Sequence, residues 1–119
     1  MATRIEITAA LDEYLDIAIV ADSSLNGLQV QGAEKVNRVA LAVDASQATI
    51  EAAVDADCQF LFVHHGLFWG QQVPLTGVVG QRVRTCFAGD LSVYAAHLPL
   101  DVHAEVGNNV LLAKRLGAR

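Results

Sequence analysis

The sequence has few of the features that mark membrane, secreted or nucleic-acid-binding proteins. Its 119 residues contain no apolar run that approaches the roughly 18 to 20 residues needed to cross a bilayer. The segment from Met1 to Glu6 has no basic region followed by an apolar stretch, so no secretion signal is predicted. The eight Lys and Arg residues are scattered, the net charge is −5, and no basic stripe could neutralise phosphates. We therefore predict a cytoplasmic protein with no membrane or nucleic-acid partner.

Other common chemistries also lack their motifs. There is no phosphate-binding P-loop, no nucleophile elbow and no paired-cysteine motif. The two cysteines, Cys58 and Cys86, lie far apart, and in a cytoplasmic chain we expect both to be buried, reduced thiols. Apolar residues make up 53% of the chain, which is enough for a real core. Residues 1–119 are therefore predicted to form one domain.

Helix and strand patterns alternate along this domain. A capping box, Thr3-x-x-Glu6, opens the first predicted helix, and Ser46 can cap the second. The predicted helices cover residues 4–19, 47–57, 78–88 and 106–116, and the predicted strands cover residues 28–30, 36–43, 60–63 and 91–96. The apolar, β-branched run of residues 36–43 is predicted to be a buried strand. This alternation predicts an α/β fold with a mostly parallel or mixed sheet flanked by helices.

Polar residues follow three of the predicted strands. They are Asp44, the pair His64-His65, and the segment from His97 to Asp101. In parallel sheets, ligands bind beyond the carboxyl ends of the strands, so we expect these groups to gather at one edge. For Asp44 the simpler alternative is a carboxylate beside a helix N-terminus, where the helix dipole favours negative charge.

The pair His64-His65 is the sharpest of these signals. Neighbouring side chains in a strand point to opposite faces, so both can serve one centre only where the strand ends and the backbone turns. Gly66 directly after the pair would allow that turn. The alternative is one buried, hydrogen-bonded histidine and one exposed histidine.

Asp101 follows His97 by four residues, with Pro99 between them. Because proline disrupts a helix interior, we expect an extended turn rather than a helical pair. Imidazole with carboxylate suits zinc, iron or manganese, and a carboxylate can bridge two metals about 3.5 to 4 Å apart. Asp101 alone could equally be a turn carboxylate. For His97 we favour a role in which it donates a hydrogen bond to a metal ligand or contacts the substrate. The less favoured alternatives are a metal ligand and a histidine of the core.

Several neighbouring residues have two interpretations. Asn26 and Gln29 flank a glycine and are either a polar clamp near the site or part of a plain turn. Trp69 could stack on a flat ligand or act as packing beside the site. His103 is expected at the surface or rim, and Gly107-Asn-Asn109 is expected to cap the last helix.

Five segments together resemble a known family. They are Ser24–Val30, Ala40–Ser46, Leu61–Trp69, Tyr94–Asp101 and Gly107–Asn109. They are similar to the Nif-three-like family of dinuclear-metal proteins, also called GTP cyclohydrolase I type 2 homologues. The resemblance implies the first half of that family's α/β fold, assembled as a ring-shaped homohexamer. It also implies two divalent metal ions per complete subunit, without distinguishing zinc, iron, manganese, cobalt or nickel.

Matched by position, His64, His65 and Asp101 correspond to family metal ligands, and His97 to a site histidine that could lie behind the ligands or transfer a proton. The chain departs from the family because members have a C-terminal half with a further His and Glu, which His103 and Glu105 do not match. We therefore expect a partial ligand set: a fragment is the simplest account, although another chain could supply the rest or metal could bind weakly.

The resemblance implies a metal-dependent hydrolase in which a dinuclear centre activates water, acting on a small molecule such as GTP or a phosphoester. The alternatives are a non-catalytic metal- or ligand-binding or regulatory protein, and an inactive truncated form. Whether the chain is an enzyme stays open at this point, since fold analogy does not supply function.

Overall fold

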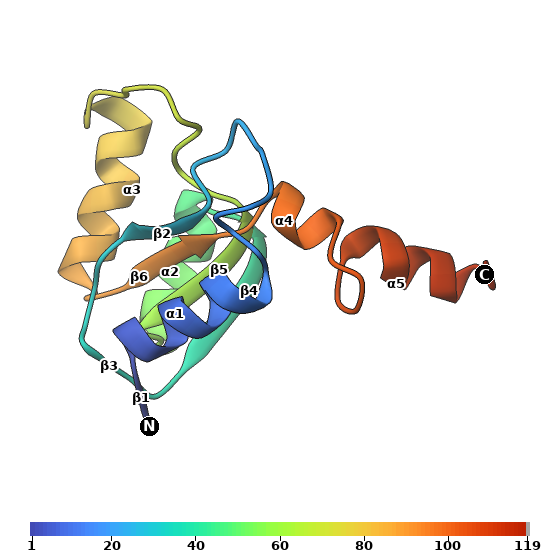
Figure 1. The fold of residues 1–119 in the computed structure, drawn as a ribbon. Coiled ribbons are helices and arrows are strands. Elements are labelled where there is room, and N and C mark those ends of the chain that lie inside the picture. The colour runs from blue at the N-terminus through green and yellow to red at the C-terminus, as the bar shows by residue number, and fades with distance from the viewer. Residues whose placement is uncertain (119) are drawn as a thin grey trace.

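A four-stranded mixed sheet forms the centre of the molecule, in a computed structural model that describes residues 1–118. Its strands are β2 (Gly27–Val30), β6 (Ser92–Ala95), β5 (Phe60–His65) and β4 (Val39–Asp44), in that order across the sheet (Figure 1). Strands β4, β5 and β6 are parallel, and β2 is antiparallel to β6. Two short strands, β1 (Ala2–Thr3) and β3 (Lys35–Val36), pair separately. The predicted α/β fold with a mixed sheet is confirmed.

Helices cover the two faces of this sheet unequally. Helices α2 (Gln47–Asp55) and α3 (Gly77–Ala88) pack on one face, and α1 (Arg4–Tyr14) lies on the other (Figure 1). The alternation of side chains along the strands explains the division. Leu61 and Val63 of β5 join the core with α2 and α3, whereas Phe60 joins the core beneath α1.

The helix starts follow the sequence closely. Thr3 and Glu6 form the predicted capping box of α1, and the Ser46 hydroxyl accepts a hydrogen bond from the backbone N–H of Thr49 at 3.1 Å. The predicted extension of the first helix to residue 19 is wrong, because α1 ends at Tyr14. The helices α1, α2 and α3 are each followed, two residues after their last residue, by an aspartate in the left-handed region: Asp16 (φ 52°), Asp57 (φ 55°) and Asp90 (φ 50°).

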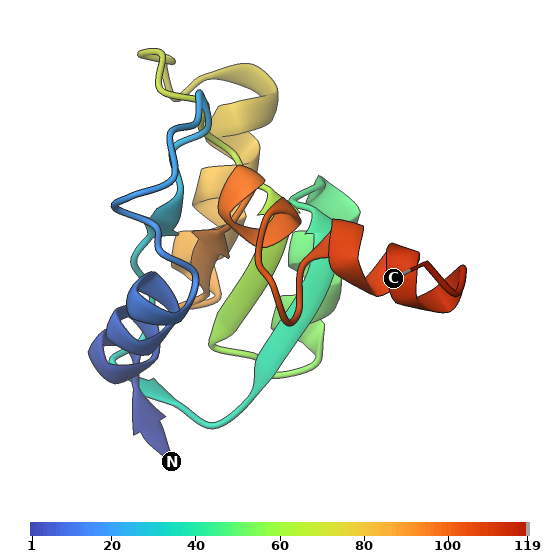
Figure 2. The ribbon, with the colours of Figure 1, turned by 45° about the vertical axis from the view of Figure 1, so that its right-hand side comes forward.

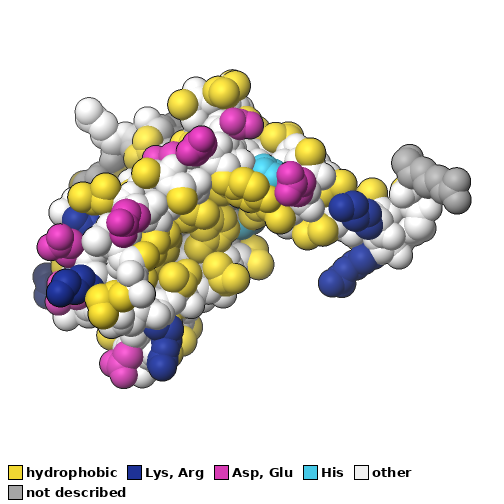
Figure 3. Space-filling model, turned by 60° about the horizontal axis from the view of Figure 1, so that its bottom comes forward, with side chains coloured by type: hydrophobic (Ala, Val, Ile, Leu, Met, Phe, Trp, Pro, Cys, Tyr) yellow, Lys and Arg dark blue, Asp and Glu magenta, His cyan; other side chains and the backbone are white. Residues whose placement is uncertain are grey.

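The prediction of a buried strand over residues 36–43 needs correction. Strand β4 lies at the edge of the sheet, and its side chains at Leu41 and Val43 are 78% and 62% exposed. They face the side that carries α1, but α1 packs over β6 and β2 and leaves this part of the sheet open. Figure 3 shows the apolar side chains that gather on this face. The sequence pattern is apolar on both faces, as in a strand covered on both sides, but only one face is covered here.

Two further helices extend from the sheet at the carboxyl end of β6. They are α4 (Leu98–Asp101) and α5 (Asn108–Arg115), which corresponds to the last predicted helix. Helix α5 projects from the body of the domain and buries none of its residues (Figures 1 and 2). Its apolar side chains Leu111 and Leu112 are exposed.

The two cysteines are buried, free thiols, as predicted. Burial raises the pKa of the Cys86 thiol to about 11. Within residues 1–118, none of the helices combines the length and apolar character needed to cross a bilayer.

Candidate metal centre

Three histidines meet where β5 and β6 end. His64 and His65 are the last residues of β5, and His97 follows β6 and precedes α4. Each offers a ring nitrogen, and these nitrogens all lie within 4.8 Å of one another. The ring centroids are 4.6 Å apart for His64 and His65, and 5.1 Å apart for His64 and His97. The parallel register thus gathers the predicted residues at one edge of the sheet, as expected.

Each of the three imidazoles is held through its Nδ1 atom. His64 Nδ1 lies 2.9 Å from the carbonyl oxygen of Ala96, His65 Nδ1 lies 2.6 Å from Asp44 Oδ1, and His97 Nδ1 lies 3.1 Å from Asp22 Oδ2. All three partners are acceptors, so each imidazole donates its Nδ1–H, and its Nε2 atom takes no part in that hydrogen bond. A histidine that binds a metal through one nitrogen commonly donates its other N–H to a carboxylate or carbonyl group in this way.

Asp101 lies beside this cluster and completes the predicted group. Its Oδ1 atom is 3.5 Å from His64 Nε2 and accepts a hydrogen bond from Asn108 Nδ2 at 2.9 Å. The predicted extended turn is wrong, since residues Leu98–Asp101 form the short helix α4. Pro99 stands in the first turn of this helix, where no intrahelical bond from its nitrogen is needed.

Asp44 acts on the cluster indirectly. It is paired with His65 in the β4–β5 register, and its carboxylate accepts the hydrogen bond from His65. The Asp44 side chain is 66% exposed, so water surrounds much of the carboxylate. The position of Asp44 at the end of β4 therefore predicted its place at the site better than its nearness to the N-terminus of α2 did.

Gly66 is needed for close packing and not for a special backbone angle. It does not adopt a positive φ. A Cβ atom at this position would lie 2.6 Å from Gln29 Nε2 and 2.7 Å from the Cβ atom of Ala95. The expectation that Gly66 allows an unusual turn is therefore replaced by a steric one: only glycine lets the loop after His65 pack against β2 and β6.

Gln29 and Asn26 form the polar clamp that was one of their two interpretations. Gln29 Oε1 accepts the backbone N–H of Leu67 at 2.7 Å, and its Nε2 donates to the carbonyl oxygens of Leu25 and Phe68. Asn26 Oδ1 accepts the backbone N–H of His97 at 2.8 Å. These amides connect the loop after His65 and the start of α4 to β2 and to the loop that precedes it.

Asp22 was not among the residues that the sequence predicted for this site. Its carboxylate, only 2% exposed, lies beneath His97. Burial alone would raise the pKa of this carboxyl, but hydrogen bonds from Asn26, Ser24, Leu98 and His97 outweigh it and hold the pKa well below its ordinary value. The only sequence signal was an aspartate that opens a turn, where it bonds the backbone N–H of Ser24 at 3.1 Å.

The remaining candidates lie around the rim. Trp69 is 40% exposed, and its ring meets the His97 ring edge-on with centroids 4.9 Å apart. A hollow of about 340 Å³ next to it is lined by Asp44, Ala45, Ser46, His65, Gly66, Trp69 and Arg82. The Nε atom of Arg82 is buried without a hydrogen-bond partner. His103 lies apart from the cluster, with Nε2 2.9 Å from the carbonyl oxygen of Tyr14.

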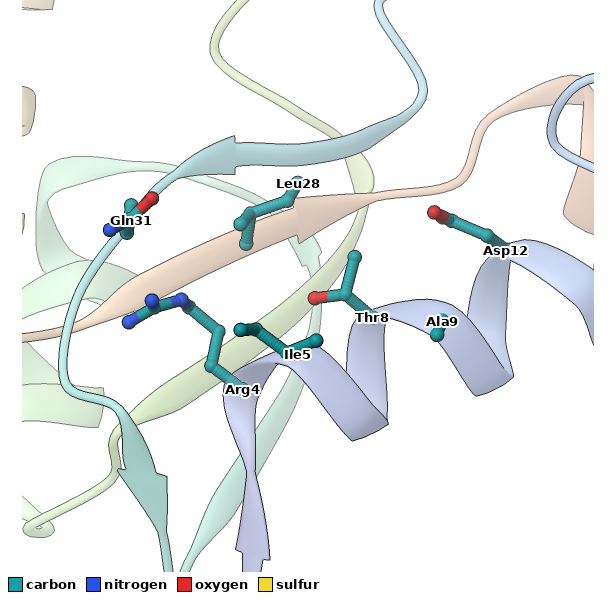
Figure 4. Close-up of a pocket in the computed structure, with 7 residues that line it drawn as sticks. All are labelled: Arg4, Ile5, Thr8, Ala9, Asp12, Leu28 and Gln31. Carbon is teal, nitrogen blue, oxygen red and sulfur yellow. The ribbon is translucent and has the colours of Figure 1, made fainter.

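Another hollow, between α1 and β2, shares no lining residue with the histidine cluster (Figure 4). Its lining includes Arg4, Thr8 and Asp12. The Arg4 guanidinium donates to the carbonyl oxygen of Gly32, and Asp12 Oδ1 accepts the Tyr94 hydroxyl at 2.8 Å. The charged groups of this hollow are thus engaged within the fold.

Proteins of known sequence share most of this chain. A GTP cyclohydrolase 1 type 2 homolog from Deinococcus radiodurans is 50% identical over 113 residues, which are 95% of this chain and 43% of that protein. The homolog from Archaeoglobus fulgidus is 47% identical over 113 residues, 95% of this chain and 46% of its own length. The chain therefore spans less than half the length of these two relatives.

Solved structures agree with the fold. The protein TTHA1606 from Thermus thermophilus has a TM-score of 0.92 and 50% identity, covering 97% of this chain and 48% of that one. Reduced HcgD from Methanocaldococcus jannaschii has a TM-score of 0.83 and 27% identity, covering 94% and 46%. The sequence profile of one family matches residues 2–119. The chain thus belongs to the Duf34/NIF3 (NGG1p interacting factor 3) family.

Proposed function

We propose that this chain provides the imidazole-rich part of a dinuclear metal centre in a metal-dependent hydrolase. The observation that carries the proposal is the common arrangement of three histidines, each held at Nδ1 by an acceptor, with ring nitrogens within 4.8 Å of one another. Neutral imidazoles with a free Nε2 are the form that binds divalent transition metals. His64 and His65 would supply these nitrogens, and Asp101 a carboxylate. The closeness of the His97 ring nitrogen favours a third nitrogen ligand, instead of the place behind the ligands or at the substrate that the sequence favoured.

The bound ions would polarise the substrate and lower the pKa of a coordinated water. Residues of the protein fix the orientation of the side chains that would bind these ions. The carbonyl oxygen of Ala96 and the carboxylate of Asp44 orient His64 and His65, while Asn108 holds Asp101 by its Oδ1 atom. Such preset ligands lose little entropy when an ion binds.

The hollow beside His65 favours an anionic substrate. Arg82 lines it, and its guanidinium group is a bidentate donor that suits a phosphate or carboxylate. Trp69 adds an aromatic ring at the same rim, against which a nucleobase could stack. Both features fit the two substrates under consideration, GTP and a smaller phosphoester, and the relatives' name points to the first.

We further propose that the centre is closed by sequence of the kind found in the remaining half of the longer relatives. A third hollow, of about 400 Å³, is lined by His64 and Asn108 and by the apolar residues Leu41, Ala42, Val43, Phe62 and Leu100. It adjoins the open face of β4. A parallel sheet normally has both faces covered, so a covering segment at this place would bring its own side chains next to His64. The homohexamer implied by the resemblance is part of the same proposal for the complete subunit.

The test is metal content and affinity in matched variants. His64→Ala should lose most bound Zn²⁺ or Mn²⁺ by elemental analysis and titration calorimetry. His103→Ala is the control, because His103 lies outside the cluster and should keep its metal. A chimera with the C-terminal part of the Deinococcus radiodurans relative should bind metal more tightly than residues 1–119 and show the larger mass of an oligomer by light scattering.

Equal metal content in His64→Ala and the parent protein would refute the site. Equal affinity in the chimera and residues 1–119 would refute the closing segment. Turnover is measured on the metal-loaded chimera with GTP and a phosphoester panel. Product that depends on both metal and His64 supports the hydrolase, whereas tight metal binding with no product favours a binding or regulatory role.

A further inference from the structure

The carboxylate of Asp22 is the most heavily bonded acceptor near the histidine cluster. It accepts the backbone N–H of Ser24 at 3.1 Å, the Asn26 amide at 3.1 Å and the backbone N–H of Leu98 at 2.9 Å. The fourth partner is the His97 ring, through Nδ1 at 3.1 Å. The first three partners are donors, so the carboxylate is engaged as an acceptor and can accept a further hydrogen bond from His97 Nδ1.

Asn26, a partner of Asp22, also binds the backbone of His97. Asn26 donates its amide N–H to Asp22 and accepts the backbone N–H of His97 at 2.8 Å. Asp22 and Asn26 therefore hold His97 at the ring and at the main chain, from a loop about seventy residues earlier in the sequence. Such a two-point hold fixes both where the ring lies and which of its nitrogens carries the proton.

Asp22 differs in this respect from Asp44, the other carboxylate that holds a histidine. The Asp44 side chain is 66% exposed and Asp22 only 2% exposed. Water can replace the Asp44 hydrogen bond to His65, whereas no water reaches the Asp22 carboxylate to replace it. A buried, fully bonded carboxylate also fixes its partner more firmly than a solvated one.

We infer that Asp22 is a positioning residue that acts through His97. It holds the imidazole in the tautomer with hydrogen on Nδ1, and so keeps Nε2 free as a third nitrogen donor beside His64 and His65. The inference rests on the proposed function in one respect only, namely that His97 Nε2 binds a metal ion. The hold itself, and the tautomer that it sets, are properties of this chain alone.

The experiment has one measurement that needs no metal. In ¹⁵N-labelled metal-free protein, long-range ¹H–¹⁵N correlation spectra report which ring nitrogen of His97 is protonated. We expect the Nδ1–H form in the parent protein. In Asp22→Asn, the new amide can donate to Nδ1, and we expect the Nε2–H form to rise. An Nε2–H tautomer in the parent protein would overturn the inference even if the variant failed to fold.

The second measurement is Zn²⁺ affinity by titration calorimetry, in the same chimera that is used to test the metal centre. Loss of a partner of this kind lowers metal affinity roughly 10- to 100-fold, and we expect that range for Asp22→Asn. Asp44→Asn is the matched control and should have a smaller effect, because water can replace its hydrogen bond. Unchanged affinity in a folded Asp22→Asn, with affinity lost in His64→Ala, would overturn the inference and leave the metal centre standing. Equal affinity in His64→Ala and the parent protein would instead refute the metal centre, and the tautomer measurement would still decide the role of Asp22.

Discussion

Replacement of Gly66 by alanine tests whether close packing behind the histidines holds them in place. The new Cβ atom would lie 2.6 Å from Gln29 Nε2 and 2.7 Å from the Cβ atom of Ala95, which is fully buried. Such distances are well inside van der Waals contact. The Gln29 amide can move, but Ala95 in the central strand β6 cannot move without shifting the sheet.

The expected loss of stability follows from these contacts. Overpacking in a filled core costs about 1 to 3 kcal/mol. Displacing Gln29 also weakens its hydrogen bonds to Leu67 and Phe68 in the loop after His65, at about 1 kcal/mol net for each bond lost. We therefore expect Gly66→Ala to lower the free energy of unfolding by about 2 to 5 kcal/mol.

The assay is urea unfolding followed by circular dichroism, on Gly66→Ala, Gln29→Ala and the double variant. Because Gln29→Ala removes one of the two obstructing side chains, the double variant should be less destabilised than the sum of the single variants. A change below about 0.5 kcal/mol for Gly66→Ala would refute the packing argument, since surface substitutions typically give changes of that size. Strict additivity would show that the clash with Gln29 is absent.

Two further predictions concern Cys86 and Arg82. Burial raises the pKa of the Cys86 thiol from 9.0 to about 11, so the folded protein keeps a proton that the unfolded chain loses above pH 9. The free energy of unfolding should fall by about 2 to 3 kcal/mol between pH 9 and 11, at 1.36 kcal/mol for each pKa unit. An equally steep fall in Cys86→Ala would assign the effect to other groups. Arg82→Ala should raise the KM of an anionic substrate about tenfold, the loss expected for one charge-assisted hydrogen bond of about 1.5 kcal/mol, while metal content stays unchanged. An unchanged KM would remove Arg82 from substrate recognition.

The sequence predicted the order of elements and the meeting of the histidines, because both depend on local patterns. An apolar run such as Phe60–Val63 that ends in two histidines places them at a strand end whatever the rest of the chain does. Parallel pairing with β6 then brings His97 alongside. The capping residues Thr3 and Ser46 likewise needed no tertiary information.

Three of the errors came from information that lies far away in the sequence. The exposure of Leu41 depends on where α1 packs, which the pattern of β4 does not contain. The role of Asp22 depends on its contact with His97, 75 positions away. Gly66 was assigned a backbone role because its steric contacts, Gln29 and Ala95, come from two other strands.

The aspartates that follow α1, α2 and α3 affect the melting temperature of this domain. A left-handed φ is disfavoured by roughly 1 to 2 kcal/mol in residues with a Cβ atom, and glycine avoids this cost. Asp16, Asp57 and Asp90 also place a negative charge next to the carbonyl end of a helix dipole, where it is unfavourable. Because the three sites lie on separate helices, their penalties should add. Asp57 and Asp90 lie just before β5 and β6, at the opposite end of these strands from the histidines, so substitutions at these two helix exits could raise the melting temperature without disturbing the chemistry.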